Sequence, residues 1–241
     1  MSDNFGYQQP SVSRAGANVD AGLKAHMQSV YNRMTAGVFI TGLTAWLVSS
    51  SPALMNFFLG GPQMYIVIFA PLAVLWFGFR PERMTPNQLM ASFGVLSVLY
   101  GISFASIFFI YTQASIAQAF FMATALFAGL SIFGYVTKKN LDALGTFAIM
   151  GIMGVFIVSI GTMVAGMFGV ETSMMQTVIS GVGLLAFAGL TAYRTQTTKE
   201  MYHASYGADA NSRMAWAAAL DLYISFIAMF QYILHLLGNR N

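Results

Sequence analysis

Asp221 is the first candidate for chemistry, because it lies inside a long apolar stretch. It is the only charged residue between Met214 and Asn239, and it follows Arg213 by eight residues. In a helix, that separation corresponds to about 12 Å. An ionised carboxylate at mid-helix costs about 2.5–3.5 kcal/mol on membrane-insertion scales, so it should face protein or water and have a partner. Two interpretations remain open: an ion pair that fixes helix packing, or an ion or proton site.

Arginines are the candidate partners of Asp221. Arg194 ends the preceding apolar stretch, and the polar segment between the two stretches is short enough to make them neighbours. Arg80 and Arg83 end an earlier apolar stretch, and long arginine side chains can reach back along a helix. The commoner role for an arginine such as Arg80 at a helix end is to extend toward lipid headgroups.

The inventory of reactive side chains argues against an enzyme. The chain has no cysteine, and no two of its histidines, His26, His203 and His235, are one helical turn apart. A membrane zinc protease needs paired histidines with a nearby glutamate. A dyad of Ser131 or Ser159 with His235 would lack a group to orient the base, and buried serines in membrane helices usually hydrogen-bond to backbone or to a neighbouring helix. We therefore expect no catalytic site, no metal site and no cofactor.

The composition is that of an integral membrane protein. Of 241 residues, 57% are hydrophobic and 8% are charged, and the mean hydropathy is +0.65. Soluble globular domains carry about 25% charged residues. The net charge of +3 includes no basic run of the kind that phosphate binding needs, which excludes a nucleic-acid partner. The lipid bilayer is the expected surrounding.

Long uncharged stretches predict seven membrane-spanning helices. The stretches between Arg33 and Arg80 and between Arg83 and Lys138 are each long enough for two crossings, at about 20 apolar residues per crossing. Turn-forming residues around Pro52, and the polar run that starts at Tyr111, divide them. The predicted helices are Tyr31–Val48, Met64–Phe79, Pro86–Ile110, Ile116–Val136, Gly145–Phe168, Ser173–Tyr193 and Met214–Leu237.

The distribution of lysine and arginine predicts the orientation. Ten of the eleven cations fall before or in the first turn of the first predicted helix, or in the second, fourth and sixth loops, and only Arg240 falls on the other side. Cytoplasmic segments carry the excess of lysine and arginine, so the amino terminus is predicted to be cytoplasmic. Residues 1–28 form a polar cytoplasmic tail, disordered at first and helical from about Asp20, whose side chain could cap that helix. Residues 29–238 form the membrane domain.

Three segments, Lys138–Leu141, Gly189–Gln196 and Leu222–Phe230, together resemble motifs of the Bax inhibitor-1 (transmembrane Bax inhibitor motif) family, in its bacterial YccA-like branch. Gly189–Gln196 (GLTAYRTQ) is similar to that family's Gly-x-x-x-Tyr-Asp-Thr-Gln. Leu222–Phe230 (LYISFIAMF) is similar to its last-helix signature Leu-Tyr-Leu-Asp-Phe-Ile-x-x-Phe, and Lys138–Leu141 (KKNL) fits its Lys-Lys-Asp-Leu turn. Each motif is loose alone, but together they are in order and in register from Gln28 to Gly238.

The resemblance implies an all-α bundle of seven membrane helices with the seventh in the centre. It also implies a leak channel for calcium, linked to protons, in a bacterial inner membrane. In the family, one aspartate from each of the last two helices shares a proton with the other and acts as a pH-sensitive latch. Two carboxylates held close together cannot both ionise cheaply. Some bacterial members associate with a membrane-bound protease, which makes such a protease a candidate partner.

This chain departs from the family pattern at the latch. Arg194 stands where the motif has its first aspartate, and Ser225 where it has the second. Asp221 lies one turn before Ser225. Our hypothesis is that Arg194 and Asp221 form a salt bridge that replaces the carboxylate pair, which would remove or strongly shift the pH response. A positive charge on Arg194 at the inner mouth would oppose cation entry.

Three function classes are compatible with these observations. The leading one is a cation-leak scaffold whose ion path or latch contains Asp221, Arg194, Ser225 and Arg80. The second is a non-conducting adaptor that regulates a membrane-bound protease or another membrane partner. The third is a small-molecule transporter, which is disfavoured because a charged substrate would need more than one buried polar group.

Overall fold

The computed structural model describes residues 12–203 and 205–239, with side chains from Ala21 onward. All regular elements in this part of the chain are helical. In chain order they are α1 (Val12–Ser49), α2 (Pro52–Leu59), α3 (Gln63–Ala73), the π-helical turn η1 (Val74–Gly78), α4 (Pro86–Phe104), α5 (Ile107–Ile110), α6 (Gln113–Val136), α7 (Asp142–Met167), α8 (Ser173–Met201) and α9 (Ala208–Leu237).

Local sequence explains where several of these helices begin. At α4, the Thr85 hydroxyl accepts from the Gln88 backbone N–H, and the Gln88 side chain accepts from the Thr85 N–H. Pro86 occupies the first turn, where its missing N–H costs nothing. At α6, the Thr112 side chain accepts from the Ser115 N–H. The predicted break that starts at Tyr111 is therefore confirmed, because α5 ends at Ile110 and α6 begins at Gln113.

The predicted count of seven crossings is supported only in part. Within the described residues, five helices are long and apolar enough to cross a bilayer, or six if Ala21–Ser49 and Pro52–Leu59 count as one broken span, bent by 105°. The remaining apolar helix, Gln63–Gly78, is shorter. It contains Pro71, which cannot donate a backbone hydrogen bond, and it ends in the π-helical turn, so its helical geometry is irregular. The short helix α2 was not predicted.

Three helices extend beyond their predicted limits by six residues or more. The helix α1 begins at Val12 rather than near Asp20, α8 continues past Tyr193 to Met201, and α9 begins at Ala208 rather than Met214. The prediction followed apolarity, which ends near the membrane surface, whereas a helix needs only compatible backbone preferences. The predicted cap by Asp20 and the predicted disorder of residues 1–11 lie outside the described side chains and residues.

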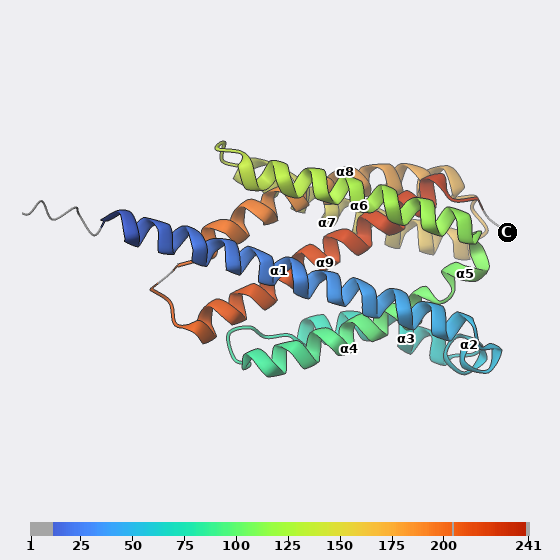
Figure 1. Ribbon diagram of the computed structural model, residues 1–241. Helices are drawn as coiled ribbons and strands as arrows, with labels where there is room; N and C mark the ends of the chain where they lie inside the picture. The colour runs from blue at the N-terminus through green and yellow to red at the C-terminus, as the bar shows by residue number, and fades with distance from the viewer. Residues whose placement is uncertain (1–11, 204, 240–241) are drawn as a thin grey trace, which may run out of the picture.

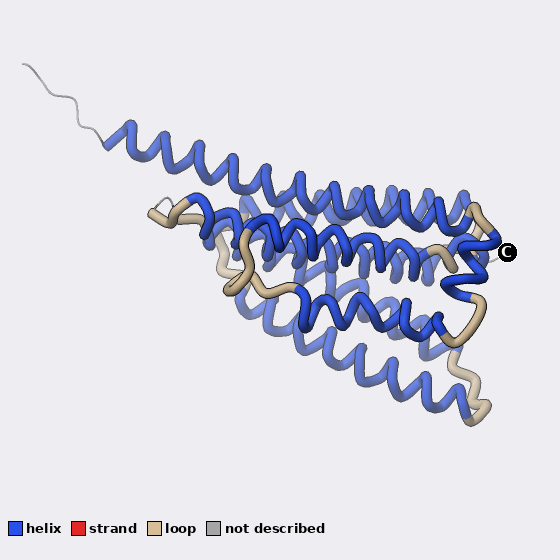
Figure 2. The backbone as a smooth tube through the Cα atoms, turned by 90° about the horizontal axis from the view of Figure 1, so that it is seen from below, coloured by secondary structure: helices blue, strands red, loops and turns tan. Residues whose placement is uncertain are grey.

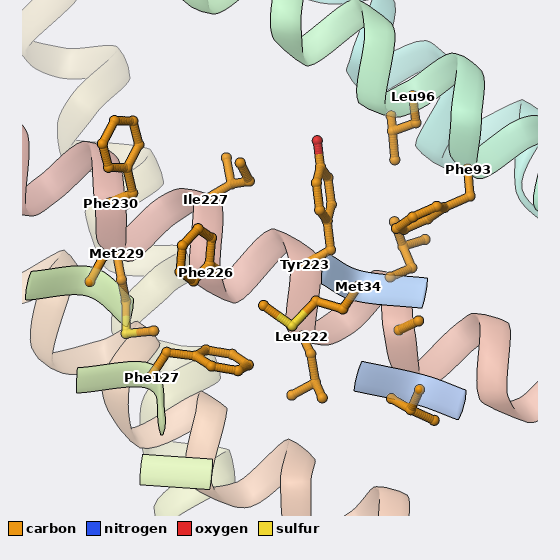
Figure 3. Packing of buried hydrophobic residues seen from close by; sticks show 14 of the residues in the cluster. Met34, Phe93, Leu96, Phe127, Leu222, Tyr223, Phe226, Ile227, Met229 and Phe230 are labelled. Atoms are coloured by element: carbon orange, nitrogen blue, oxygen red, sulfur yellow. The ribbon is translucent and has the colours of Figure 1, made fainter. Parts of the chain in front are cut away.

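The last helix, α9, lies in the middle of the bundle, as predicted. It runs between α1, α4, α6 and α8 and contacts all four (Figure 1). Of its apolar stretch, 67% is inside the bundle, against 11% for α7. Figure 3 shows α9 side chains pointing to different neighbours, with Tyr223 directed toward Phe93 and Leu96 of α4 and Phe226 toward Phe127 of α6. The core is therefore organised around α9.

The helices run side by side, with their connections gathered at two ends (Figure 2). The connections η1–α4, α6–α7 and α8–α9 lie at one end, on the left in Figure 1. The first two of these carry Arg80 and Arg83, and Lys138 and Lys139, respectively. The connections α1–α2, α5–α6 and α7–α8 lie at the opposite end. One end of the bundle is thus the more basic one.

Candidate functional site

An ion pair joins α8 to the central helix. Arg194 Nη1 lies 3.2 Å from Asp221 Oδ2, and α8 packs directly against α9. The two side chains are 31% and 40% exposed, respectively. The pair is therefore neither fully buried nor freely solvated, and its attraction is screened less than that of a surface pair.

The hydrogen bonding around Arg194 is incomplete within the described part of the chain. Its Nε atom is buried and has no hydrogen-bond partner there. The guanidinium lies 5.9 Å from the centre of the Tyr193 ring, a cation–π distance. Buried polar atoms are normally paired, and an unpaired one indicates a strained or functional position. Asp221 is thus the residue that balances the Arg194 charge in this structure.

The other two residues proposed for the latch or ion path are placed differently. Ser225 is fully buried, and its hydroxyl donates to the Asp221 backbone carbonyl at 2.9 Å. It therefore bonds within α9. Arg80 is exposed in the connection between η1 and α4, and the ion pair between described residues is made by Arg194 instead. The structure thus brings Arg194 and Asp221 together, puts Ser225 one turn away, and leaves Arg80 at the basic end.

A row of threonines on α8, missed by the sequence analysis, adds polar groups near the pair. Thr191, Thr195 and Thr198 are buried and lie three or four residues apart, which puts them on one face. Thr195 Oγ1 lies 3.5 Å from Ser131 Oγ on α6. The signal was available in the sequence as hydroxyls at helical spacing on either side of Arg194.

A second polar contact on α9, also missed, involves only neutral groups. The hydroxyls of Thr41 on α1 and Tyr223 on α9 are 2.7 Å apart. Thr41 Oγ1 also lies within hydrogen-bond distance of the Ser97 carbonyl on α4, at 3.0 Å. We call these three residues the hydroxyl cluster; their exposed fractions are 2%, 0% and 0% for Thr41, Tyr223 and Ser97. It joins α1, α4 and α9 inside the bundle.

Two of the motifs noted in the sequence contact each other. Gln196, the last residue of the Gly189–Gln196 motif, accepts from the Leu141 backbone N–H and donates to the Lys139 carbonyl, both at 2.9 Å. The turn before α7 is thereby fixed to α8. These backbone groups have no helical partner, so the glutamine satisfies polar groups that would otherwise be unpaired.

Comparison with known proteins gives a consistent result. A family model described as "Inhibitor of apoptosis-promoting Bax1" matches residues 23–241. A protein of Caulobacter vibrioides is 35% identical, over 98% of each chain. A protein of Rickettsia prowazekii is 32% identical, over 92% of each chain. The inner membrane protein YbhL of Escherichia coli K12 is 31% identical, over 91% of this chain and 94% of its own. Together with the apolar helical bundle, these matches show that the chain is an integral membrane protein that belongs to the Bax inhibitor-1 family.

Proposed function

We propose that this protein is a cation-leak scaffold of the Bax inhibitor-1 type in which an ion pair replaces the proton-sharing latch. The observation that supports the proposal is the Arg194–Asp221 contact of 3.2 Å between α8 and the central helix α9. It lies on the two helices that carry the family's latch motifs. The ions proposed for the path are calcium or protons, and the proposal includes no catalytic activity and no bound cofactor.

Replacing two carboxylates by an ion pair changes how the contact between α8 and α9 responds to pH. A latch of two carboxylates opens and closes because they share one proton, and that proton binds or leaves within the physiological range. Arginine stays protonated at any physiological pH. A contact between Arg194 and Asp221 therefore has no shared proton to lose, and we propose that helix separation here does not follow pH.

A second candidate function is a non-conducting adaptor. Arg194, the cation of the ion pair found among the described residues, is a fixed positive charge, and a positive residue at a pore opposes cation passage. The two large cavities described below include neither Arg194 nor Asp221 in their linings. Both observations favour a bundle that is closed at this level. Such a protein would act on a membrane partner, for which a membrane-bound protease is the candidate.

We also propose a topology and a location. Seven crossings result if the bent pair of α1 and α2 counts as one span and Gln63–Gly78 crosses despite its short length. The basic end of the bundle, with Arg80, Arg83, Lys138 and Lys139, then faces the cytoplasm together with the amino terminus. The printed name of the Escherichia coli relative supports a bacterial inner membrane.

Calcium flux into liposomes tests the proposal. The native protein is compared with the double variant Arg194→Asp/Ser225→Asp, at mildly acidic and mildly alkaline pH, with an indicator dye inside the vesicles. We expect native flux that is independent of pH, and flux that depends on pH in the double variant. Arg83→Asp, which reverses a charge in an exposed connection, is the control and should behave like the native protein.

Other outcomes would change the conclusion. Flux in the double variant but none in the native protein would mean that Arg194 closes the scaffold, and the adaptor function would replace the channel. A native flux with the pH dependence of the double variant would contradict the ion-pair latch. Absence of flux in both proteins, with both correctly inserted, would contradict the leak function itself.

A further inference from the structure

Two cavities lie in a row between α1 and α6. The first has a volume of about 670 Å³, and the second about 460 Å³. Val38, Phe120 and Phe226 line both, so the two cavities adjoin each other. Cavities of about 300–1,000 Å³ are typical of ligand sites. We call the combined depression the α1–α6 groove.

The groove exists because α1 and α6 are both packed on α9 but make little direct contact with each other. In Figure 1 they run side by side across the bundle, with α9 behind them. Phe226 of α9 forms the floor, and Phe127 of α6 packs edge-on against it at a centroid distance of 5.8 Å. On α6 the groove is lined by two small exposed residues, Thr124 and Ala128, which leave space over the Phe226 ring.

The charged residue that lines the groove, Lys24, lies at the basic end of α1. Lys24 and Gln28 line it at the basic end, and Met34 and Val38 line it further along α1. From Gln28 to Val38 is about 15 Å of helix, which is half of the roughly 30 Å thickness of a bilayer's hydrocarbon core. The first cavity therefore has the length of one leaflet, with its polar end at the side where the headgroups of that leaflet would lie.

The polar end carries positive charge. Lys24 lines the cavity directly. Lys199 of α8 lies at the edge of the cavity, because its Nζ donates to the Tyr135 carbonyl at 3.1 Å and lies 5.1 Å from the centre of the Tyr135 ring. Tyr135 is itself part of the lining. Lysines at a membrane surface attract anionic headgroups, and tyrosine favours the same interfacial depth.

We propose that the α1–α6 groove binds one anionic phospholipid of the cytoplasmic leaflet. Its headgroup contacts Lys24 and Lys199, and one acyl chain lies along Met34 and Val38 and over Phe226. The positive charge at the polar end, next to the apolar side chains of Met34, Val38 and Phe226, matches a headgroup and an acyl chain and distinguishes this occupant from a protein helix, whose apolar face would need no cation there. The site is separate from the Arg194–Asp221 pair, so the proposal holds whether or not the protein conducts ions.

Native mass spectrometry of the purified protein tests the acyl-chain part. The full chain in detergent is given phosphatidylglycerol or phosphatidylcholine, and the lipid retained per molecule is counted. Ala128→Trp puts a large ring into the groove, whereas Ala125→Trp puts the same ring on the neighbouring exposed position, outside the lining. We expect one retained phosphatidylglycerol in the native protein and in Ala125→Trp, and its loss in Ala128→Trp.

The headgroup part is tested by removing one charge. Lys24→Gln should reduce the preference for phosphatidylglycerol over phosphatidylcholine about fivefold, the effect of one lysine at a membrane surface. Lys138→Gln removes a charge from the exposed turn before α7 and should leave the preference unchanged.

Equal retention of phosphatidylglycerol in Ala128→Trp and Ala125→Trp would overturn the proposal. A native dimer that Ala128→Trp dissociates would also overturn it, because the groove would then hold a second copy of the chain.

Discussion

Asp221 and Tyr223 are two residues apart on α9, yet their polar contacts differ in every respect. Residues at that spacing point to roughly opposite sides of a helix. Asp221 pairs with Arg194 on α8 through full charges, with exposed fractions of 40% and 31%. Tyr223 bonds to Thr41 on α1 through neutral hydroxyls, and both side chains are at most 2% exposed. The central helix is therefore held on one side by a buried neutral contact and on the other by a partly accessible charged one.

The packing around the two contacts also differs. On the α1 and α4 side, Tyr223 also packs against the rings of Phe93 and Tyr100, at centroid distances of 5.2 and 5.9 Å. Separating α9 from α1 and α4 would break the hydrogen bond of the Tyr223 hydroxyl and would also leave an unfilled space where its ring now packs. On the α8 side, the ion pair can exchange protein contacts for water or ions, because it is already partly accessible. The two sides of α9 are therefore expected to respond differently to the loss of one polar contact and to salt.

The largest expected effect comes from breaking the buried side. Tyr223→Ala removes a fully buried ring and its hydroxyl, and we expect a loss of about 2–5 kcal/mol in the free energy of unfolding. Tyr65→Ala is the control, because Tyr65 is 62% exposed on α3. Thermal unfolding in detergent, followed by near-ultraviolet circular dichroism, measures both. Similar losses in the two variants would show that the hydroxyl cluster does not fix α9.

An intermediate effect is expected from breaking the charged side. Asp221→Asn leaves the Arg194 charge unbalanced. Breaking a buried pair costs about 3–5 kcal/mol and a surface pair about 0–1 kcal/mol. Because this pair is partly exposed, we expect about 1–2 kcal/mol. Glu171→Gln, which removes a charge from an exposed connection, should cost much less.

A double-variant comparison separates the ion pair from other effects of Asp221→Asn. Adding Arg194→Gln removes the unbalanced charge, so the double variant should recover part of the lost stability. The measurement is again the thermal midpoint in detergent, together with protein yield. Unchanged yield and midpoint in Asp221→Asn would show that the ion pair contributes nothing to the fold. A simple sum of the two single losses would show that the residues are not coupled.

The smallest expected effect is a difference in salt dependence between the two contacts. Raising the ionic strength from about 0.01 M to about 1 M shortens the Debye length from about 30 Å to about 3 Å. The stability cost of Asp221→Asn should therefore shrink in high salt. The cost of Tyr223→Phe, about 0.6 kcal/mol for one hydrogen bond within the membrane, should stay the same. A salt-dependent cost of Tyr223→Phe would contradict the description of the hydroxyl cluster as a buried contact between neutral groups.

Much of the fold can be predicted from the sequence, because segments in lipid must be apolar and uncharged whereas segments in water carry the charges. The uncharged stretches predicted the helices α4, α6, α7, α8 and α9, and the turn residues before Pro52 predicted the end of α1. The cations predicted a basic end. The irregular segment Gln63–Gly78 and the additional helix α2 were harder to predict, since apolar content alone does not separate a full crossing from a shorter helix.

The sequence by itself determined that the chain is a helical membrane protein and that Asp221 needs a partner, because a lone carboxylate in lipid is costly. Only the tertiary structure decided that Arg194 is that partner, that Thr41 meets Tyr223 across 182 positions of sequence, and that α1 and α6 leave a groove between them. The physical reason is that lipid is as apolar as the core of the bundle. Apolar residues therefore cover all sides of these helices, and the sequence does not show which side faces lipid and which faces the bundle. Packing between the helices decides this.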